Sequence, residues 1–404
     1  MRKRLAAVLA LVVVVAGACS KADKSTATGP TTVAKGAQTL PIGVDAKTPG
    51  FAASWTHFFP HTLQAHPGDT LEFTSHFTGE PHTVAFGTLI SDGIAAHDRI
   101  DPKATTPPPP DIQAVLDKIP FLFTDNGGPD NLFNQAGSQP CYLATAEPPT
   151  KEACPQDKQV APKEITGKER FLNTGFLADG KVASFKLSPA MSPGLYTFMC
   201  LVHGPEMTET VTVINKDITI PGPDAVAAEG RKHLDEFVGQ VKATAANVQT
   251  STSDQVPAGA VSPDKTVPSA SINVFPTEVS VKAGEKLTWT VNGFHVIAFN
   301  APEDARPWLQ FDDSGALVTN KKSFEPAASP ALPSPPAPAA NAPPNAPPPQ
   351  IKVDAGAWDG QGFHSSGAPF SDAQLVYSLA FTTPGTYKYL CLVHPDMEGT
   401  VKVT

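Results

Sequence analysis

Cysteine and methionine are scarce in this chain, which has 404 residues and five of each. Outside residues 5–18, no apolar run approaches the roughly 20 residues needed to cross a bilayer. The sequence also lacks a Gly-rich phosphate loop, a Gly-x-Ser-x-Gly elbow, a His-Glu-x-x-His motif and any His-x-His pair. These absences argue against nucleotide hydrolysis, serine hydrolysis and zinc-peptidase chemistry. The formal net charge of −9 argues against nucleic acid or anionic lipid as a partner.

The N-terminus has the pattern of an export signal. A basic start, Met1 to Arg4, precedes the apolar residues 5–18, and this predicts a secretory signal peptide over residues 1–18. Small residues directly before Cys19 resemble a bacterial lipobox, which implies a lipoprotein with the lipid on Cys19. An ordinary cleavage site with an unrelated cysteine is the alternative. Residues 19–45 are mostly small and polar at their start and are expected to form a flexible tether.

Two short loops each contain side chains that are soft metal ligands. Each follows a Pro-Gly-x-Tyr turn and contains a cysteine, then a histidine, then a methionine. Each also has a histidine far upstream in a strand-like run. Two histidines and one cysteine, with a weak axial methionine, form the ligand set of a blue (type 1) copper centre. The two predicted sets are His82, Cys200, His203 and Met207, and His295, Cys391, His394 and Met397.

With these motifs, both halves of the chain resemble cupredoxins, the plastocyanin, pseudoazurin and amicyanin group. The resemblance implies an all-β fold with two Greek-key β-sandwiches, each binding one type 1 copper. It also implies that the loop histidines His203 and His394 lie nearest the solvent and pass electrons. Cupredoxins often have asparagine after the first histidine, where this chain has Thr83 and Val296. The resemblance therefore does not supply the hydrogen bond that this asparagine gives to the cysteine loop.

An internal repeat supports two domains. Residues 59–73 align without gaps with residues 275–289, and both segments alternate apolar and polar residues around a Gly-Asp or Gly-Glu turn. Residues 171–175 correspond to residues 363–367. The expected organisation is domain 1 at 46–216 with an insertion at about 88–168, a linker at 217–268 with a helix starting near Pro223, and domain 2 at 269–404 with a Pro-rich insertion at about 301–362.

The other cysteines and histidines have simpler interpretations. Cys141 and Cys154 remain after lipid and copper are assigned, and an exported chain favours a disulfide between them, worth about 3 kcal/mol for such a loop. His57 and His61 lie four residues apart on one strand. Surface or edge histidines are the default interpretation there, and a further metal site is the alternative. His97 and His233 have no partners nearby in sequence.

The sequence favours an electron carrier over an enzyme. Two-domain copper oxidases and nitrite reductases place a histidine directly beside the blue-copper cysteine, whereas Cys200 and Cys391 have methionine or leucine on either side. A copper storage or delivery protein is the alternative function. We expect a lipid-anchored, extracytoplasmic protein on the cell membrane. Its partner would be a redox protein such as a membrane respiratory complex.

Overall fold

The computed structural model describes residues 36–101, 106–123, 133–150, 152–252, 255–261, 270–334, 347–369 and 373–404. The predicted signal peptide, Cys19 and most of the predicted tether lie outside these residues.

Domain 1 is a sandwich of two sheets around one apolar core. Alternating buried and exposed residues, as in β1, give each strand one face toward that core. The first sheet runs in the order β3 (Phe58–Phe59), β1 (Thr39–Val44), β5 (Thr70–Ser75) and β9 (Val182–Lys186). The second runs β4 (Thr62–Ala65), β11 (Gly204–Val213), β10 (Gly194–Cys200), β6 (Ala85–Phe86), β8 (Phe171–Thr174) and β7 (Pro140–Leu143).

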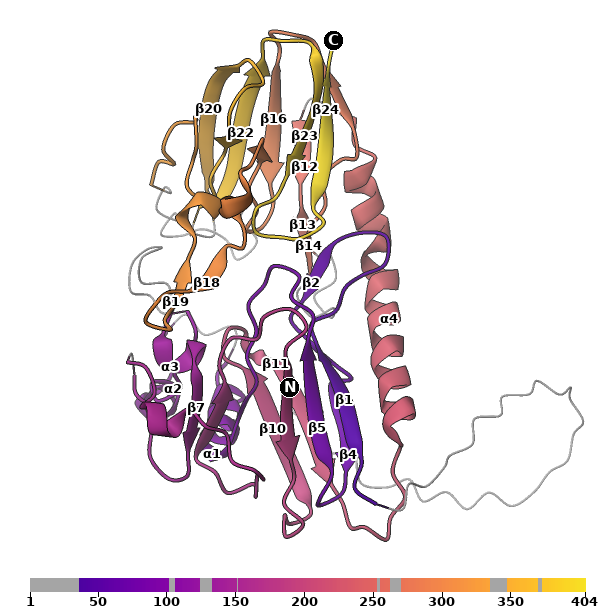
Figure 1. The fold of residues 1–404 in the computed structure, drawn as a ribbon, viewed down its shortest axis with the longest axis vertical. Helices are drawn as coiled ribbons and strands as arrows, with labels where there is room; N and C mark the ends of the chain where they lie inside the picture. The colour runs from indigo at the N-terminus through magenta and orange to yellow at the C-terminus, as the bar shows by residue number, and fades with distance from the viewer. Residues whose placement is uncertain are drawn as a thin grey trace, which may run out of the picture. The chain divides into compact units, whose positions relative to one another are not determined.

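Domain 2 repeats this plan (Figure 1). Its first sheet runs β12 (Gln255–Ala258), β16 (Lys286–Val291), β22 (Gln374–Phe381) and β20 (Gln350–Trp358). Its second runs β15 (Val279–Val281), β24 (Glu398–Val403), β23 (Gly385–Leu390), β17 (Ala298–Phe299) and β21 (His364–Ser365).

The strand orders show that the repeat comprises a whole domain. The order β15-β24-β23-β17-β21 in domain 2 matches β4-β11-β10-β6-β8 in domain 1, and β12-β16-β22 matches β1-β5-β9. The gapless sequence alignment placed β4 over β15 and β5 over β16, and both pairs occupy equivalent places in the two sheets. The predicted all-β class with two sandwiches and a connecting helix is confirmed.

Several segments expected to be irregular form structure. The tether was predicted to extend to residue 45, but its last part forms β1 (Thr39–Val44), which pairs with β5 in parallel. The predicted linker contains β12, which pairs with β16, and the second insertion contains β20, which pairs with β22. These strands could be missed because parallel pairing joins segments that are far apart in sequence.

The first insertion is also structured. It holds α1 (Thr88–His97), α2 (Pro110–Leu116), α3 (Gln135–Ser138) and the edge strand β7. Short 3-10 turns occur at Gln156–Lys158, Glu303–Ala305 and Lys321–Ser323, and the second insertion adds the hairpin of β18 (Leu309–Phe311) and β19 (Leu317–Thr319).

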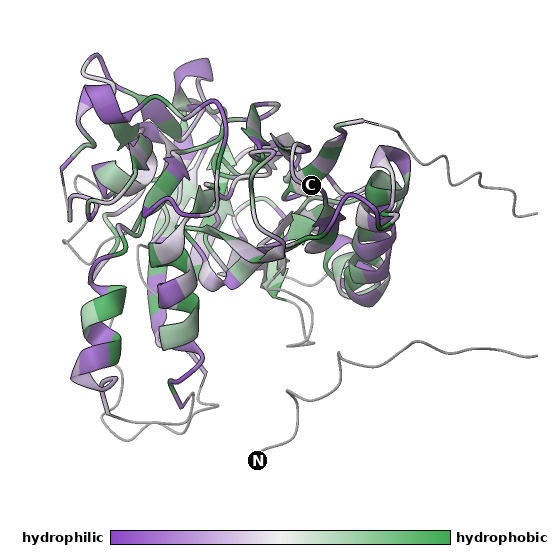
Figure 2. Ribbon diagram, turned by 90° about the horizontal axis from the view of Figure 1, so that it is seen from below, coloured by the Kyte–Doolittle hydropathy of each residue, from purple (hydrophilic) through white to green (hydrophobic). Residues whose placement is uncertain are grey.

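A long helix, α4 (Pro223–Gln249), connects the domains and starts at the proline that the sequence indicated. Hydrophobic and hydrophilic residues both occur along it (Figure 2). Its apolar side packs on an apolar cluster that contains Trp55 and Ile272, and Trp55 stacks on Phe237 with ring centroids 5.9 Å apart. Beside it, β2 (Ala53–Trp55), β14 (Ala270–Ile272) and β13 (Ala260–Val261) form a small sheet that ties domain 1 to the start of domain 2.

Candidate metal centres

The first candidate centre, centre 1, consists of His82, Cys200 and His203. His82 lies in the loop between β5 and β6, Cys200 ends β10, and His203 lies in the turn before β11. The Cys200 Sγ atom is 3.9 Å from His82 Nδ1 and 3.6 Å from His203 Nδ1. His82 and Cys200 are fully buried, and His203 is half-buried. Two segments of the sandwich, the β5–β6 loop and the turn between β10 and β11, therefore converge on one point.

Centre 2 repeats the arrangement with His295, Cys391 and His394, all of them buried. The Cys391 Sγ atom is 3.6 Å from His394 Nδ1, and the two Nδ1 atoms of His295 and His394 are 3.0 Å apart. Within the described residues, these are the two groups of three or more such side chains whose ligand atoms lie within 4.8 Å of one another.

The nitrogen–sulfur distances of both centres fit a bound metal ion. Metal–nitrogen bonds of about 2.0–2.1 Å and metal–sulfur bonds of about 2.3 Å, at a trigonal angle, separate nitrogen from sulfur by about 3.8 Å. The observed separations of 3.6–3.9 Å bracket this value. One thiolate and two imidazoles suit copper or zinc and do not suit magnesium or calcium.

The electrostatics of centre 1 favour a thiolate. Burial alone would raise the pKa of the Cys200 thiol, but hydrogen bonds and charge from His203 and His82 outweigh it and hold this pKa well below its usual range. Burial likewise opposes protonation of His82, while Asp45 and Cys200 raise its pKa to about 10. A metal cation at the same position would replace the proton and meet a ligand sulfur that is already ionised.

Centre 2 shows the same balance. Burial opposes ionisation of Cys391, but His295 and His394 hold the pKa of its thiol well below the usual range. Burial would also lower the pKa of His394, whereas contacts with Cys391 and Glu80 raise it to about 9. The pKa of His295 is lowered, chiefly by burial.

Carboxylates of domain 1 contact the outer nitrogen of one histidine in each centre. The His82 Nε2 atom lies 3.3 Å from Asp45 Oδ2, and the His394 Nε2 atom lies 3.6 Å from Glu80 Oε1. Asp45 is itself fixed by Thr78, whose hydroxyl donates a hydrogen bond of 2.5 Å to Asp45 Oδ2. Such partners orient a metal-binding imidazole and set which nitrogen keeps its proton.

Thr83 supplies the brace that the family resemblance left open. Its hydroxyl oxygen accepts a hydrogen bond of 2.8 Å from the backbone N–H of Leu201, next to the cysteine. Val296 has no such oxygen in centre 2, where its backbone N–H points to Cys391 Sγ at 3.5 Å. There the Arg306 guanidinium donates to the carbonyl oxygen of Cys391 instead.

The expectation that His394 faces solvent is wrong. Its side chain has no exposed surface, because the segment Thr78 to Glu80 of domain 1 covers it. A Cβ atom at Gly79 would lie 2.3 Å from His394 Cδ2, and the Trp308 indole N–H donates a hydrogen bond of 3.0 Å to the Gly79 carbonyl. Domain 1 thus covers His394, and Trp308 of the second insertion holds the covering segment. This contact could not be predicted from the sequence.

Both predicted axial methionines are buried near their centres. Met207 shares the apolar core of domain 1 with Cys200, and Met397 shares that of domain 2 with Cys391. The Met397 carbonyl accepts a hydrogen bond of 2.9 Å from the Cys391 N–H. Their role as fourth ligands stays a prediction.

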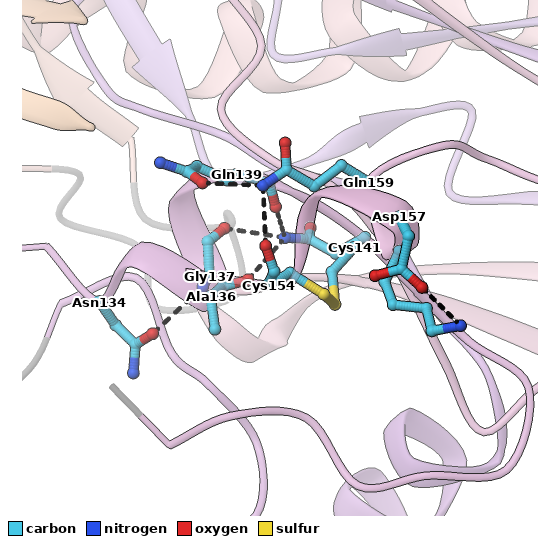
Figure 3. The surroundings of a disulfide bond; sticks show 10 residues. Asn134, Ala136, Gly137, Gln139, Cys141, Cys154, Asp157 and Gln159 are labelled. Atoms are coloured by element: carbon cyan, nitrogen blue, oxygen red, sulfur yellow. Dashed lines mark hydrogen bonds and ion pairs between the residues drawn. A yellow bond between two sulfur atoms is a disulfide. The ribbon is translucent and has the colours of Figure 1, made fainter. Parts of the chain in front are cut away.

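Cys141 and Cys154 form a disulfide (Figure 3). The S–S distance is 2.07 Å, and both residues are buried in an apolar cluster with α1 residues. Nearby, Gln159 donates hydrogen bonds to Gln139 and to the Cys154 carbonyl. The disulfide therefore ties β7 to the part of the first insertion that follows this strand.

No protein-family model and no curated protein matches the sequence. Solved structures that resemble it include auracyanin of Roseiflexus castenholzii, with 16% identity over 44% of this chain and 98% of that one and a TM-score of 0.22. A pseudoazurin from Sinorhizobium meliltoi has 18% identity over 48% of this chain and 91% of that one, with a TM-score of 0.17.

A copper-containing nitrite reductase from Thermus scotoductus SA-01 spans both domains. It has 13% identity over 91% of this chain and 68% of that one, and a TM-score of 0.20. Because all three TM-scores are below 0.5, the centres are assigned from this chain's own residues. Both domains are β-sandwiches with equivalent strand orders. Among the described residues, no helix is long and apolar enough to cross a membrane.

Proposed function

We propose that this chain is an electron-transfer protein with two type 1 copper centres, one in each domain. The observation that carries the proposal is that the imidazole and thiolate ligands of each centre already lie at metal-binding separations. Bound copper would supply a one-electron couple that cycles between Cu(I) and Cu(II). A buried, rigid ligand set limits rearrangement between the two oxidation states.

The two centres differ in access. His203 of centre 1 is half-buried, whereas His394 of centre 2 is fully buried beneath domain 1. We therefore propose that centre 1 exchanges electrons with an external partner through His203. Glu80 lies 3.6 Å from His394 Nε2 and stands two residues before His82. The two centres are therefore linked by a short path that is covalent from His82 to Glu80 and non-covalent from Glu80 to His394. The proposed partner is a redox protein such as a respiratory complex.

The location and the absence of catalysis also belong to the proposal. A lipid on Cys19 would hold the protein at the outer side of the cell membrane. The residues beside each cysteine are Met199, Leu201, Leu390 and Leu392. None of these side chains can relay electrons to a catalytic copper as the adjacent histidine does in copper oxidases and nitrite reductases, so we propose a carrier and not an enzyme.

Copper storage or delivery is the second candidate. A delivery protein releases Cu(I) to a competing acceptor, which favours exposed and adaptable ligands. Here the thiolates of Cys200 and Cys391 are both fully buried, which supports slow release and hence the carrier.

Copper loading tests the proposal. The purified protein should bind two coppers per chain and be intensely blue. Cys200→Ser and Cys391→Ser should each remove one copper and part of the colour, and the double variant should be colourless. An exposed control, Ser91→Ala, should retain both. Blue colour that survives in the double variant would refute the assigned ligands.

A further inference from the structure

Three histidines that belong to neither copper centre come together. His57 and His61 flank β3, and His233 lies on α4. The ring centroids of His57 and His61 are 4.9 Å apart, as are those of His61 and His233. The ligand pairs of the two copper centres have nearly the same ring separations, 4.9 Å for His82 and His203 and 4.7 Å for His295 and His394. The ligand nitrogens of the three histidines do not all lie within 4.8 Å of one another, so metal binding requires a side-chain rotation.

Two imidazole nitrogens in this cluster are buried and have no hydrogen-bond partner. They are His57 Nε2 and His233 Nδ1. His57 is 9% exposed, and its ring is held edge-on against Phe59 and Phe237. Buried polar atoms in proteins are nearly always paired, so two orphaned nitrogens in one cluster call for a ligand.

The other nitrogen of His233 is already committed. His233 Nε2 lies 3.0 Å from Glu229 Oε1, one helical turn earlier on α4. This contact places the proton on Nε2 and leaves the lone pair of Nδ1 free. A carboxylate on the far nitrogen of an imidazole is the usual support of a metal-binding histidine.

The remaining histidine has room to complete the set. His61 is exposed, so its ring can turn toward its neighbours without loss of packing. Burial, together with the charges of His61 and His233, lowers the pKa of His57 to about 3. His57 is therefore neutral near pH 7, the form that binds metals.

We infer that His57, His61 and His233 form a third metal site, for a divalent ion of the zinc and copper class. Imidazole ligands without a thiolate suit Zn²⁺ and Cu²⁺ and do not suit Mg²⁺ or Ca²⁺. A metal there would join β3 to the connecting helix α4. The sequence hinted at His57 and His61, but His233 could not be included because it follows 172 residues later on another element.

Zinc titration of the tag-free, copper-loaded protein tests this site. Measured against a chromophoric zinc chelator, one Zn²⁺ per chain should bind while the blue absorption stays unchanged. Glu229→Ala should weaken binding by about 10–100-fold, and His61→Ala and His233→Ala should weaken it more. His97→Ala, an exposed histidine on α1, should bind zinc like the wild type.

Two results would overturn the inference. One is zinc binding that is equal in wild type, His61→Ala and His233→Ala, and the other is zinc that binds only as the blue colour disappears. Cu²⁺ added to the Cys200→Ser/Cys391→Ser double variant gives a second readout that does not need the blue colour. One copper equivalent of the non-blue Cu(II) EPR signal with nitrogen couplings should be lost when His233→Ala is added. A signal of unchanged intensity in that triple variant would also contradict the site.

Discussion

Gly79→Ala, which adds a single methyl group, tests whether domain 1 covers centre 2. Gly79 adopts φ +123°, a region that L-residues avoid, and an added Cβ would lie 2.3 Å from His394 Cδ2 and 3.0 Å from His394 Cα. The backbone strain of Gly79→Ala costs about 1–3 kcal/mol, and overpacking against a buried ring costs a further amount of about 1–3 kcal/mol. The free energy of unfolding should therefore fall by about 2–6 kcal/mol.

Gly180→Ala is the matched control for this prediction. Gly180 also has positive φ, +71°, but nothing lies within 4 Å of its added Cβ, so only the backbone cost of about 1 kcal/mol applies. Urea unfolding of Gly79→Ala and of Gly180→Ala, both without copper, gives the difference between their free energies of unfolding. In a Cys200→Ser background, where only centre 2 is blue, Gly79→Ala should shift or bleach the absorption and Gly180→Ala should not.

The result that refutes the reasoning is equally clear. If Gly79→Ala loses no more stability than Gly180→Ala and leaves the absorption of centre 2 unchanged, domain 1 does not cover His394. Centre 2 would then be open to a partner, and the proposed access through centre 1 alone would fail.

Three further predictions follow from single residues. Glu209 is buried with both carboxylate oxygens unpartnered, and burial raises its pKa well above the usual range. Because the folded pKa is raised, the contribution of Glu209 to the free energy of unfolding is complete below about pH 4.5. This contribution is lost as pH rises toward the folded pKa, at about 1.4 kcal/mol per pH unit. Glu209→Gln should remove this decline in urea unfolding measured from pH 5 to 8, and an unchanged slope would contradict it. Met397→Leu should keep the blue colour and raise the reduction potential of centre 2, since it removes a thioether that stabilises Cu(II); voltammetry with no shift would exclude Met397 as a ligand. Cys19→Ser should move the protein from the membrane to the soluble fraction, and unchanged fractionation would exclude a lipid on Cys19.

The sequence predicted the features that short motifs and periodicity can carry. The Cys–His–Met loops identified six of the proposed ligands, and alternating residues around a Gly-Asp turn located β4 and β5 and their counterparts in domain 2. Upstream histidines His82 and His295 were found because each precedes a short apolar strand in the repeat.

Contacts between distant segments could not be predicted from the sequence. The cover of Gly79 and Glu80 over His394 depends on how two domains pack, and the pairing of β12 with β16 joins segments that no local pattern connects. His233 meets His61 only because α4 packs along domain 1. In each case the deciding contact is set by packing between elements and not by the composition of one segment.

Voltammetry of the copper-loaded protein, combined with a chelator challenge, tests the central claim most directly. An electron carrier keeps its metal in both oxidation states. Each thiolate is buried beside histidines from separate parts of its own sandwich. We predict two reversible one-electron waves and retention of both coppers when the reduced protein meets a moderate Cu(I) chelator. Rapid loss of copper on reduction, without a reversible wave, would contradict electron transfer and favour copper delivery.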